Sequence, residues 1–173
     1  IGVEKVYQSG SSVRMTIFHT KVDNLIEYDM GTFSYTQATN SRKSQGIEFE
    51  GKWLASDTIS VDGSYAYVDA KTGTKVAARV PGHDLSISIS ANISSKINSN
   101  LEINHIMDYK DTVSGSLVAM PDYTVTNLAV SYDMTNNLLG YVRIQDLMDT
   151  DYETVKDFNT GGRQIFAGIR ATF

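Results

Sequence analysis

The C-terminal residues alternate between apolar and polar side chains, and this period of two constrains the fold more than any other feature. Gln164, Arg170 and Thr172 fall between apolar positions, with Phe166 as the exception. Because successive side chains leave opposite faces of a strand, the pattern predicts a β-strand with one apolar face. Its length suits a tilted bilayer crossing of about ten residues, and a strand-end aromatic is typical of a membrane interface. The apolar positions are Ile165, Ala167, Ile169, Ala171 and Phe173.

The same alternation recurs along the chain, most clearly where Leu85, Ile87 and Ile89 oppose three serines. No apolar run reaches the ~20 residues of a transmembrane helix. Both prolines fall in long loops, where no ladder donor is needed. The sequence therefore predicts one all-β, antiparallel unit, residues 1–173, built as a meander of about nine strands. The expected strands are residues 1–8, 13–26, 33–54, 59–69, 84–93, 101–108, 123–133, 138–147 and 163–173.

Two features of the strands and loops favour a transmembrane barrel over a soluble β-sandwich, whose core-facing strands would alternate in the same way. Short turns alternate with long loops, as in outer-membrane barrels. Charged residues such as Glu48, Glu50 and Arg143 lie in mid-strand on the polar face, which suits a water-filled lumen. The apolar face is then expected to contact lipid. It includes Ile47, Phe49, Ile87, Ile89, Leu128 and Val130.

The aromatic residues also favour a membrane, because they collect near strand ends rather than in mid-strand, where a soluble core would bury them. With Phe173 placed at the periplasmic side, the strand directions predict one aromatic girdle at each interface. The periplasmic girdle would contain Tyr7, Trp53, Tyr132 and Phe173, and the outer girdle Tyr35, Tyr67, Tyr109 and Tyr123.

Composition and motifs narrow the function. A net charge of −5 argues against a nucleic-acid partner, and the absence of cysteine fits an oxidising periplasm. The three histidines lack metal-ligand spacing, and no serine elbow or phosphate loop is present. We therefore expect no catalytic residues, cofactor or metal site. Ligand contacts are expected from the long loops, where Arg79, Tyr109 and Tyr152 could supply charge and stacking. Gly162-Arg163 is expected to form a structural turn.

The odd strand count points to a larger barrel. Nine alternating strands would start on one side of a membrane and end on the other, whereas a bacterial barrel needs an even number. Two open edges would also leave backbone groups unpaired in lipid. The chain starts at Ile1 without an initiator methionine or a signal peptide. We therefore expect it to be the C-terminal part of a longer protein.

The segment 142–173 resembles the C-terminus of TonB-dependent outer-membrane receptors. That family has an Asn-Leu-Phe-Asp-x-x-Tyr run, a Gly-Arg pair and a terminal aromatic. Tyr152, Gly162-Arg163 and Phe173 fit this pattern, and Asp146-Leu-Met-Asp149 matches the first run in part. Two further stretches, residues 44–50 and 65–81, resemble the family's Gly-Val-Glu strand and the hairpin after it, so the resemblance covers nearly the whole chain.

The resemblance implies a plugged barrel of about 22 strands, of which this chain would be roughly the last nine, with the N-terminal plug domain outside it. It implies energised import of a small metal complex, cobalamin or an iron–siderophore, across the outer membrane of a Gram-negative bacterium. The Asp-Tyr-Glu-Thr-Val run of residues 151–155 most resembles the vitamin B12 receptors, with catecholate siderophore receptors close to them. The implied partners are outer-membrane lipid, the rest of the barrel and plug, the TonB complex, and the barrel-assembly machinery, for which Phe173 would be the signal. A small pore or adhesion barrel and a soluble all-β ligand-binding module remain alternatives.

Overall fold

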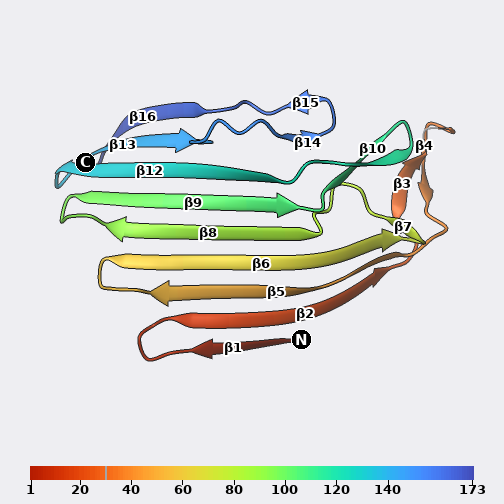
Figure 1. Ribbon diagram of the computed structural model, residues 1–173, viewed down its shortest axis with the longest axis horizontal. Helices are drawn as coiled ribbons and strands as arrows, with labels where there is room; N and C mark the ends of the chain where they lie inside the picture. Colours follow the sequence, from red (N-terminus) through yellow and green to blue (C-terminus); the bar gives the residue numbers. More distant parts are fainter. Residues whose placement is uncertain (30) are drawn as a thin grey trace.

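A single antiparallel sheet of nine long strands, which we call the wall, dominates the computed structural model, in which residues 1–29 and 31–173 are described. The strands follow one another in chain order, so the predicted all-β meander is confirmed (Figure 1). They are β1 (Gly2–Val6), β2 (Ser12–Val22), β5 (Arg42–Leu54), β6 (Ile59–Thr72), β8 (His83–Asn92), β9 (Ile97–Met107), β12 (Tyr123–Thr135), β13 (Leu138–Gln145) and β16 (Gln164–Ala171).

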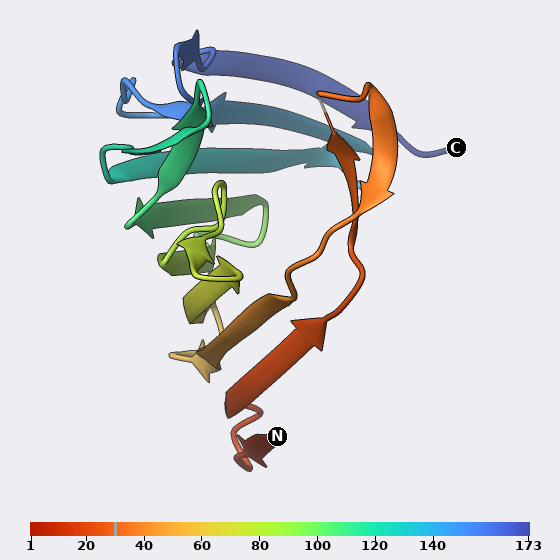
Figure 2. The same cartoon turned by 90° about the vertical axis from the view of Figure 1, so that its right-hand side faces the viewer.

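The two ends of the wall differ in their connections. Short turns join β1 to β2, β5 to β6, β8 to β9 and β12 to β13 at one end, where the C-terminus also lies (Figure 1). The long connections gather at the opposite end, which we call the loop end. Figure 2, seen from the loop end, shows that the wall is curved. No helix in residues 1–29 and 31–173 is long and apolar enough to cross a membrane.

The long connections contain small hairpins that the alternation did not reveal. The expected strands 13–26 and 33–54 are too long: β2 ends at Val22 and β5 begins at Arg42. Asn24 takes a left-handed conformation (φ 56°), which stops the strand. The added elements are β3 (Ile26–Asp29) with β4 (Ser34–Gln37), β10 (Lys110–Val113) with β11 (Ser116–Ala119), β14 (Glu153–Val155) with β15 (Phe158–Asn159), and β7 (Lys75–Val76) on β6.

The register confirms that the predicted apolar residues share one face. Ile89 is opposite Val61 and Leu101, and this row continues through Leu128 to Ile144 and Ile165. The opposite, polar face carries a hollow that extends over β1, β2, β5, β6 and β8. This hollow and a second one bordered by polar-face residues of β8 to β16 indicate that the polar face is the concave one and the apolar face the convex one.

The aromatic residues follow the prediction at the turn end but not at the loop end. Trp53 and Tyr132 lie on the apolar face near the short turns, opposite Val61 and Ile97. Of the predicted outer girdle, Tyr67 is on the apolar face. The prediction is wrong for the other three, because none of them lies on the apolar face of a wall strand. Tyr35 belongs to the β3–β4 hairpin, Tyr109 is buried in a loop, and Tyr123 shares a row with Asp84 on the polar face.

Candidate functional site

Three of the long connections are held together by one buried carboxylate. Asp111, in the β9–β12 loop, is 1% exposed. It accepts hydrogen bonds from Arg79 of the β6–β8 loop, with Nε at 2.7 Å and Nη2 at 3.4 Å. It also accepts from the backbone N–H of Thr112 at 2.7 Å and from that of Lys156, in the β13–β16 loop, at 2.9 Å. One side chain therefore joins loops that are far apart in the sequence.

The negative charge of Asp111 is matched by the positive charge of Arg79. The Arg79 guanidinium, followed by the N–H groups of Lys156 and Thr112, lowers the pKa of Asp111 to about 2. Asp111 in turn raises the pKa of Arg79. The buried carboxylate is thus ionised and satisfied, as a buried charge must be. The Arg79 side chain remains 55% exposed, so part of its guanidinium faces solvent.

A tyrosine adds a second connection among the same loops. Tyr109 is 8% exposed, and its hydroxyl donates to the Thr154 carbonyl at 2.7 Å. Burial, and then the neighbouring Asp111, raise the pKa of Tyr109. The backbone N–H of Arg79 donates to the carbonyl of Lys110 at 2.8 Å. We call Arg79, Tyr109, Asp111, Thr154 and Lys156 the loop clamp.

The structure thus places two of the three predicted ligand residues, Arg79 and Tyr109, in one cluster. The third, Tyr152, stacks on Tyr123 at the start of β12, with ring centroids 4.5 Å apart. Asp111, which holds the clamp together, was missed from the sequence. It is one of several aspartates in a polar loop, and its pairing with Arg79, 32 residues away, leaves no local signal.

The β13–β16 loop begins with a tight turn, and two of its aspartates, Asp146 and Asp149, differ in their hydrogen bonding. Asp149 Oδ1 accepts a hydrogen bond from the N–H of Arg163 at 2.8 Å. Gly162 has a left-handed φ of 61°, but residues 160–163 form neither a turn nor a strand, so the expected Gly162-Arg163 turn is not found there. Asp146 is 4% exposed, and its backbone N–H donates to Asn127 Oδ1 at 3.0 Å. Both of its carboxylate oxygens lack a hydrogen-bond partner within the described part of the chain.

The remaining long connection, between β2 and β5, exposes aromatic side chains. Ile26, Tyr28 and Tyr35 share one face of the β3–β4 hairpin, where the two tyrosine rings meet edge to face at 5.3 Å. Tyr35 is 76% exposed, and Phe33 beside it is 78% exposed. Figures 1 and 2 show this hairpin rising from β2 and β5 on the concave side of the wall.

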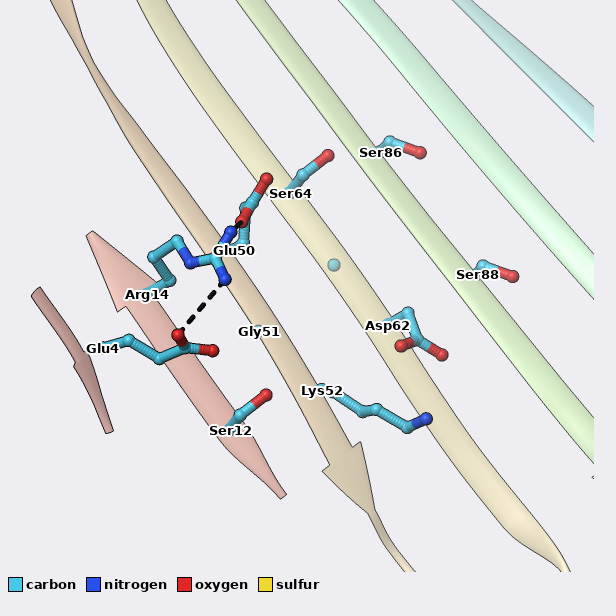
Figure 3. A pocket seen from close by; sticks show the side chains of 11 residues that line it. Glu4, Ser12, Arg14, Glu50, Gly51, Lys52, Asp62, Ser64, Ser86 and Ser88 are labelled. Carbon is cyan, nitrogen blue, oxygen red and sulfur yellow. Dashed lines mark hydrogen bonds and ion pairs between the residues drawn. The ribbon is translucent and has the colours of Figure 1, made fainter. Parts of the chain in front are cut away.

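The first strands of the wall carry an ionic network on the polar face. Arg14 lies between two carboxylates, with Nη2 3.2 Å from Glu4 and Nη1 3.2 Å from Glu50. Lys52 and Asp62 continue the polar surface on β5 and β6, where the register places them opposite each other (Figure 3). These groups border the hollow together with serines 12, 64, 86 and 88.

The last strands differ, because their cations are not neutralised by carboxylates. The Arg143 guanidinium lies 4.8 Å from the centre of the Phe166 ring, which accounts for the aromatic residue that interrupts the polar alternation of β16. Neither Arg143 nor Arg170 has a carboxylate partner in residues 1–29 and 31–173. Both side chains border a second hollow, with Tyr141 and several asparagines.

Two of the three histidines lie within hydrogen-bond distance of neighbouring hydroxyl groups. His83 Nδ1 is 2.7 Å from the Tyr65 hydroxyl, and His105 Nδ1 is 2.8 Å from Thr124 Oγ1. The described residues contain no group of three or more His, Cys, Asp or Glu side chains that could hold a metal ion.

Comparison with known proteins identifies the architecture. The chain is 24% identical over 149 residues to the metal-pseudopaline receptor CntO of Pseudomonas aeruginosa, which covers 80% of this chain and 21% of the receptor. The pyoverdine outer-membrane receptor FpvA of P. aeruginosa superposes with a TM-score of 0.81 at 19% identity, over 99% of this chain and 29% of FpvA. The ferric-catecholate import receptor Fiu of Escherichia coli K12 gives a TM-score of 0.78 at 17% identity, over 99% and 27%.

The chain therefore spans between about a fifth and a third of the length of these receptors. It superposes on part of the fold of each of these receptors, which confirms the expected all-β, antiparallel fold class. Residues 1–155 match the model of the family described as TonB dependent receptor-like, beta-barrel, and the chain belongs to that family.

Proposed function

We propose that this chain is the C-terminal barrel segment of an outer-membrane receptor that imports a small metal complex into a Gram-negative cell. The family match over residues 1–155 carries the proposal. The relatives are named for pseudopaline, pyoverdine and ferric catecholates. These names favour an iron–siderophore or a related metal chelate over cobalamin as the ligand class. The role is transport rather than catalysis.

In this proposal the convex apolar face contacts lipid and the concave polar face lines the lumen. The loop end is extracellular and the turn end periplasmic. Further strands complete the barrel at the edges of β1 and β16, because a free edge in lipid would leave backbone groups unpaired. A plug domain, supplied by another part of the receptor, occupies the lumen and receives energy from the TonB complex.

The loop clamp is the ligand platform of this proposal. Asp111 fixes three loops relative to one another, so the surface is organised before a ligand arrives, and less ordering entropy is lost on binding. Arg79 presents its exposed guanidinium edge to acidic groups of the ligand. Tyr152, held against Tyr123, offers a ring edge on the β13–β16 loop, and Tyr109 positions the same loop through Thr154.

The experiment is metal uptake by cells that carry or lack the gene of the full-length receptor. Radiolabelled iron bound to purified siderophores is supplied, with and without a functional TonB complex. The proposal expects one chelate whose uptake needs both the receptor and TonB. Receptor-dependent entry of many unrelated small solutes without TonB would instead identify an open pore, and a receptor fragment that stays soluble without detergent would identify a soluble module.

The assembly machinery is a further proposed partner, reached through β16. This strand has an edge that no strand of the described residues pairs with, and Phe173 lies at its turn end, where an aromatic ring can anchor a strand at the interface. Deleting Phe173 from the full-length receptor should lower the amount of assembled receptor per cell. The ligand dissociation constant of the receptors that do assemble should be unchanged. Normal assembly with lost affinity would contradict both this role and the orientation.

A further inference from the structure

Three lysines lie side by side on neighbouring strands at the loop end of the wall. The register pairs Lys21 of β2 with Lys43 of β5, and Lys43 with Lys71 of β6. All three side chains are exposed. We call these residues the lysine row. It crosses three strands, so a single extended surface presents three ammonium groups.

The lysine row belongs to the convex apolar face. Its members are each four residues from Ile17, Ile47 and Tyr67, which form a row of that face. Because side chains alternate with a period of two, a spacing of four keeps them on the same side. The rise of a strand places the lysines roughly 13 Å beyond the apolar row. An intermediate row contains His19, Gln45 and Asp69.

This order of side chains matches the boundary of a bilayer. The apolar belt ends with the Tyr67 ring, a residue type that favours the interface, and the cations follow at the level of lipid headgroups. The lumen and the ligand platform are on other surfaces of the molecule. A group that meets the lysine row must therefore come from the membrane around the barrel.

The charges of the row are incompletely compensated. Like charges directly opposite on neighbouring strands are destabilising. Lys21 Nζ is 3.0 Å from a carboxylate oxygen of Asp23, and Lys71 Nζ is 2.9 Å from Asp69 Oδ2. Lys43, in the centre, forms no ion pair in the described part of the chain, and the nearby Asp23, on which its charge also acts, is already paired with Lys21. Three cations thus face two carboxylates, and these exposed pairs are weak and open to competition by another anion.

We propose that the lysine row binds phosphate groups of lipids in the outer leaflet of the surrounding membrane. This inference rests on the proposed function, because it needs the convex face in lipid and the loop end outside. A phosphate brings negative charge and several acceptor oxygens, and it can bridge Lys43 with either neighbour. Its binding relieves the repulsion along the row. The bound lipid in turn pins β2, β5 and β6 at the outer interface.

The test uses the full-length receptor in nanodiscs of phosphatidylcholine that contain a small fraction of lipid A, a phosphate-bearing glycolipid. Lipid retained after extraction is counted by native mass spectrometry. The receptor should retain lipid A and ignore its phosphate-free form. Retention should weaken roughly fivefold for each lysine changed to glutamine in Lys21→Gln, Lys43→Gln and Lys71→Gln combinations. Changing all three to arginine should preserve it.

A matched control changes Lys5 and Lys96, near the turn end, to glutamine, which should leave retention unchanged. Equal retention by the receptor and by the triple glutamine variant, or equal retention of phosphate-free lipid, would overturn the site. If the triple variant does not assemble, Lys43→Gln alone provides the comparison. Failure of the proposed function would be visible separately, because the unmodified receptor would then not enter nanodiscs or would not import a metal complex.

Discussion

The wall and the loop end of this chain are built on different principles. Along the wall, most side chains of both faces stay at least partly exposed in the isolated segment, and the strands are joined by their ladders. At the loop end the chain makes packing of its own: Ala38, Ala70, Tyr109 and Met120 are the buried apolar residues within the described part of the chain. In the proposed receptor the wall would therefore depend on lipid and on the contents of the lumen for its burial, whereas the residues of the loop end bury one another.

Because the wall and the loop end differ in how their side chains are buried, they make different contributions to a receptor. A wall that takes its stability from its surroundings can accept many polar side chains on the concave face without losing the fold. A loop end held by a buried carboxylate keeps a fixed shape even before a ligand is present. Substitutions in the wall should therefore change the stability of the barrel, whereas substitutions at the loop end should change the order of the loops.

The largest effect is expected on the wall. Ile89 lies on the apolar face between Val61 and Leu101, so Ile89→Arg places a charge in lipid and should reduce the free energy of unfolding by about 2–4 kcal/mol near the bilayer midplane. Ser88→Arg, on the other face between Asp62 and Glu102, should be tolerated. Denaturant titrations of the full-length receptor in vesicles measure both variants. Equal losses at the two positions would refute the assignment of the faces.

The next effect concerns the loop clamp. Asp111→Asn keeps the side-chain shape but leaves Arg79 without its charged partner, so all three joined loops should open more often. Hydrogen exchange measured by mass spectrometry should accelerate at Arg79, Thr112 and Lys156 and remain unchanged in β5 and β6. Asp157→Asn is the control, because Asp157 is exposed and pairs with Lys156 at the surface. Acceleration confined to the β9–β12 loop would contradict a shared clamp.

The clamp should also resist acid. A carboxyl whose pKa is lowered by folding contributes stability above its unfolded pKa of about 3.9. That contribution is lost as the pH falls through the folded pKa of Asp111, about 2. Exchange in the three loops, corrected for the intrinsic rate, should therefore stay constant from neutral pH to about pH 4 and rise only below it. A transition near neutral pH would exclude Asp111 as the group responsible.

The contrast between the regions also explains what the sequence revealed. The strands of the wall could be predicted because apolar and polar residues alternate along each of them with a period of two. Leu85, Ile87 and Ile89 are an example. The clamp could not be predicted, because Arg79 and Asp111 meet only after the wall has brought their loops together. Short hairpins such as β10–β11 have too few residues to show an alternation of apolar and polar side chains. The three predicted ligand residues, Arg79, Tyr109 and Tyr152, were selected only by their location in the long loops.

A smaller gain is expected where the loop end carries an unpaired charge. The Asp146 carboxylate is buried without a hydrogen-bond partner in the described part of the chain, and burial of an unsatisfied group typically costs about 1–3 kcal/mol. Asp146→Asn removes the charge, and asparagine tolerates the left-handed backbone at this position (φ 51°). The variant should therefore be more stable than the parent in thermal unfolding of the full-length receptor. A loss of stability would show that another part of the receptor pairs with Asp146.

A single neutral hydrogen bond of the clamp should matter less. Tyr109→Phe keeps the buried ring and removes the bond to the Thr154 carbonyl, which should cost about 0.5–1.5 kcal/mol of local opening free energy in the β13–β16 loop. Tyr35→Phe removes an exposed hydroxyl and serves as the control. Hydrogen exchange near Thr154 gives the measurement. An unchanged rate would mean that the ring packing of Tyr109, rather than its hydroxyl, holds the loop.

The smallest effect on stability is expected at the aromatic face of the β3–β4 hairpin, which lies at the loop end but makes none of the clamp's hydrogen bonds. Tyr35→Ser removes a ring that is 76% exposed and whose described aromatic contact is the edge of Tyr28. Substitutions at such surface positions usually change stability by less than about 0.5 kcal/mol. Thermal unfolding should therefore be unchanged, and exchange at Lys156 and Thr112 should not respond. A large loss would mean that the hairpin packs against the rest of the receptor, and the loop end would then form one body rather than a clamp beside an independent hairpin.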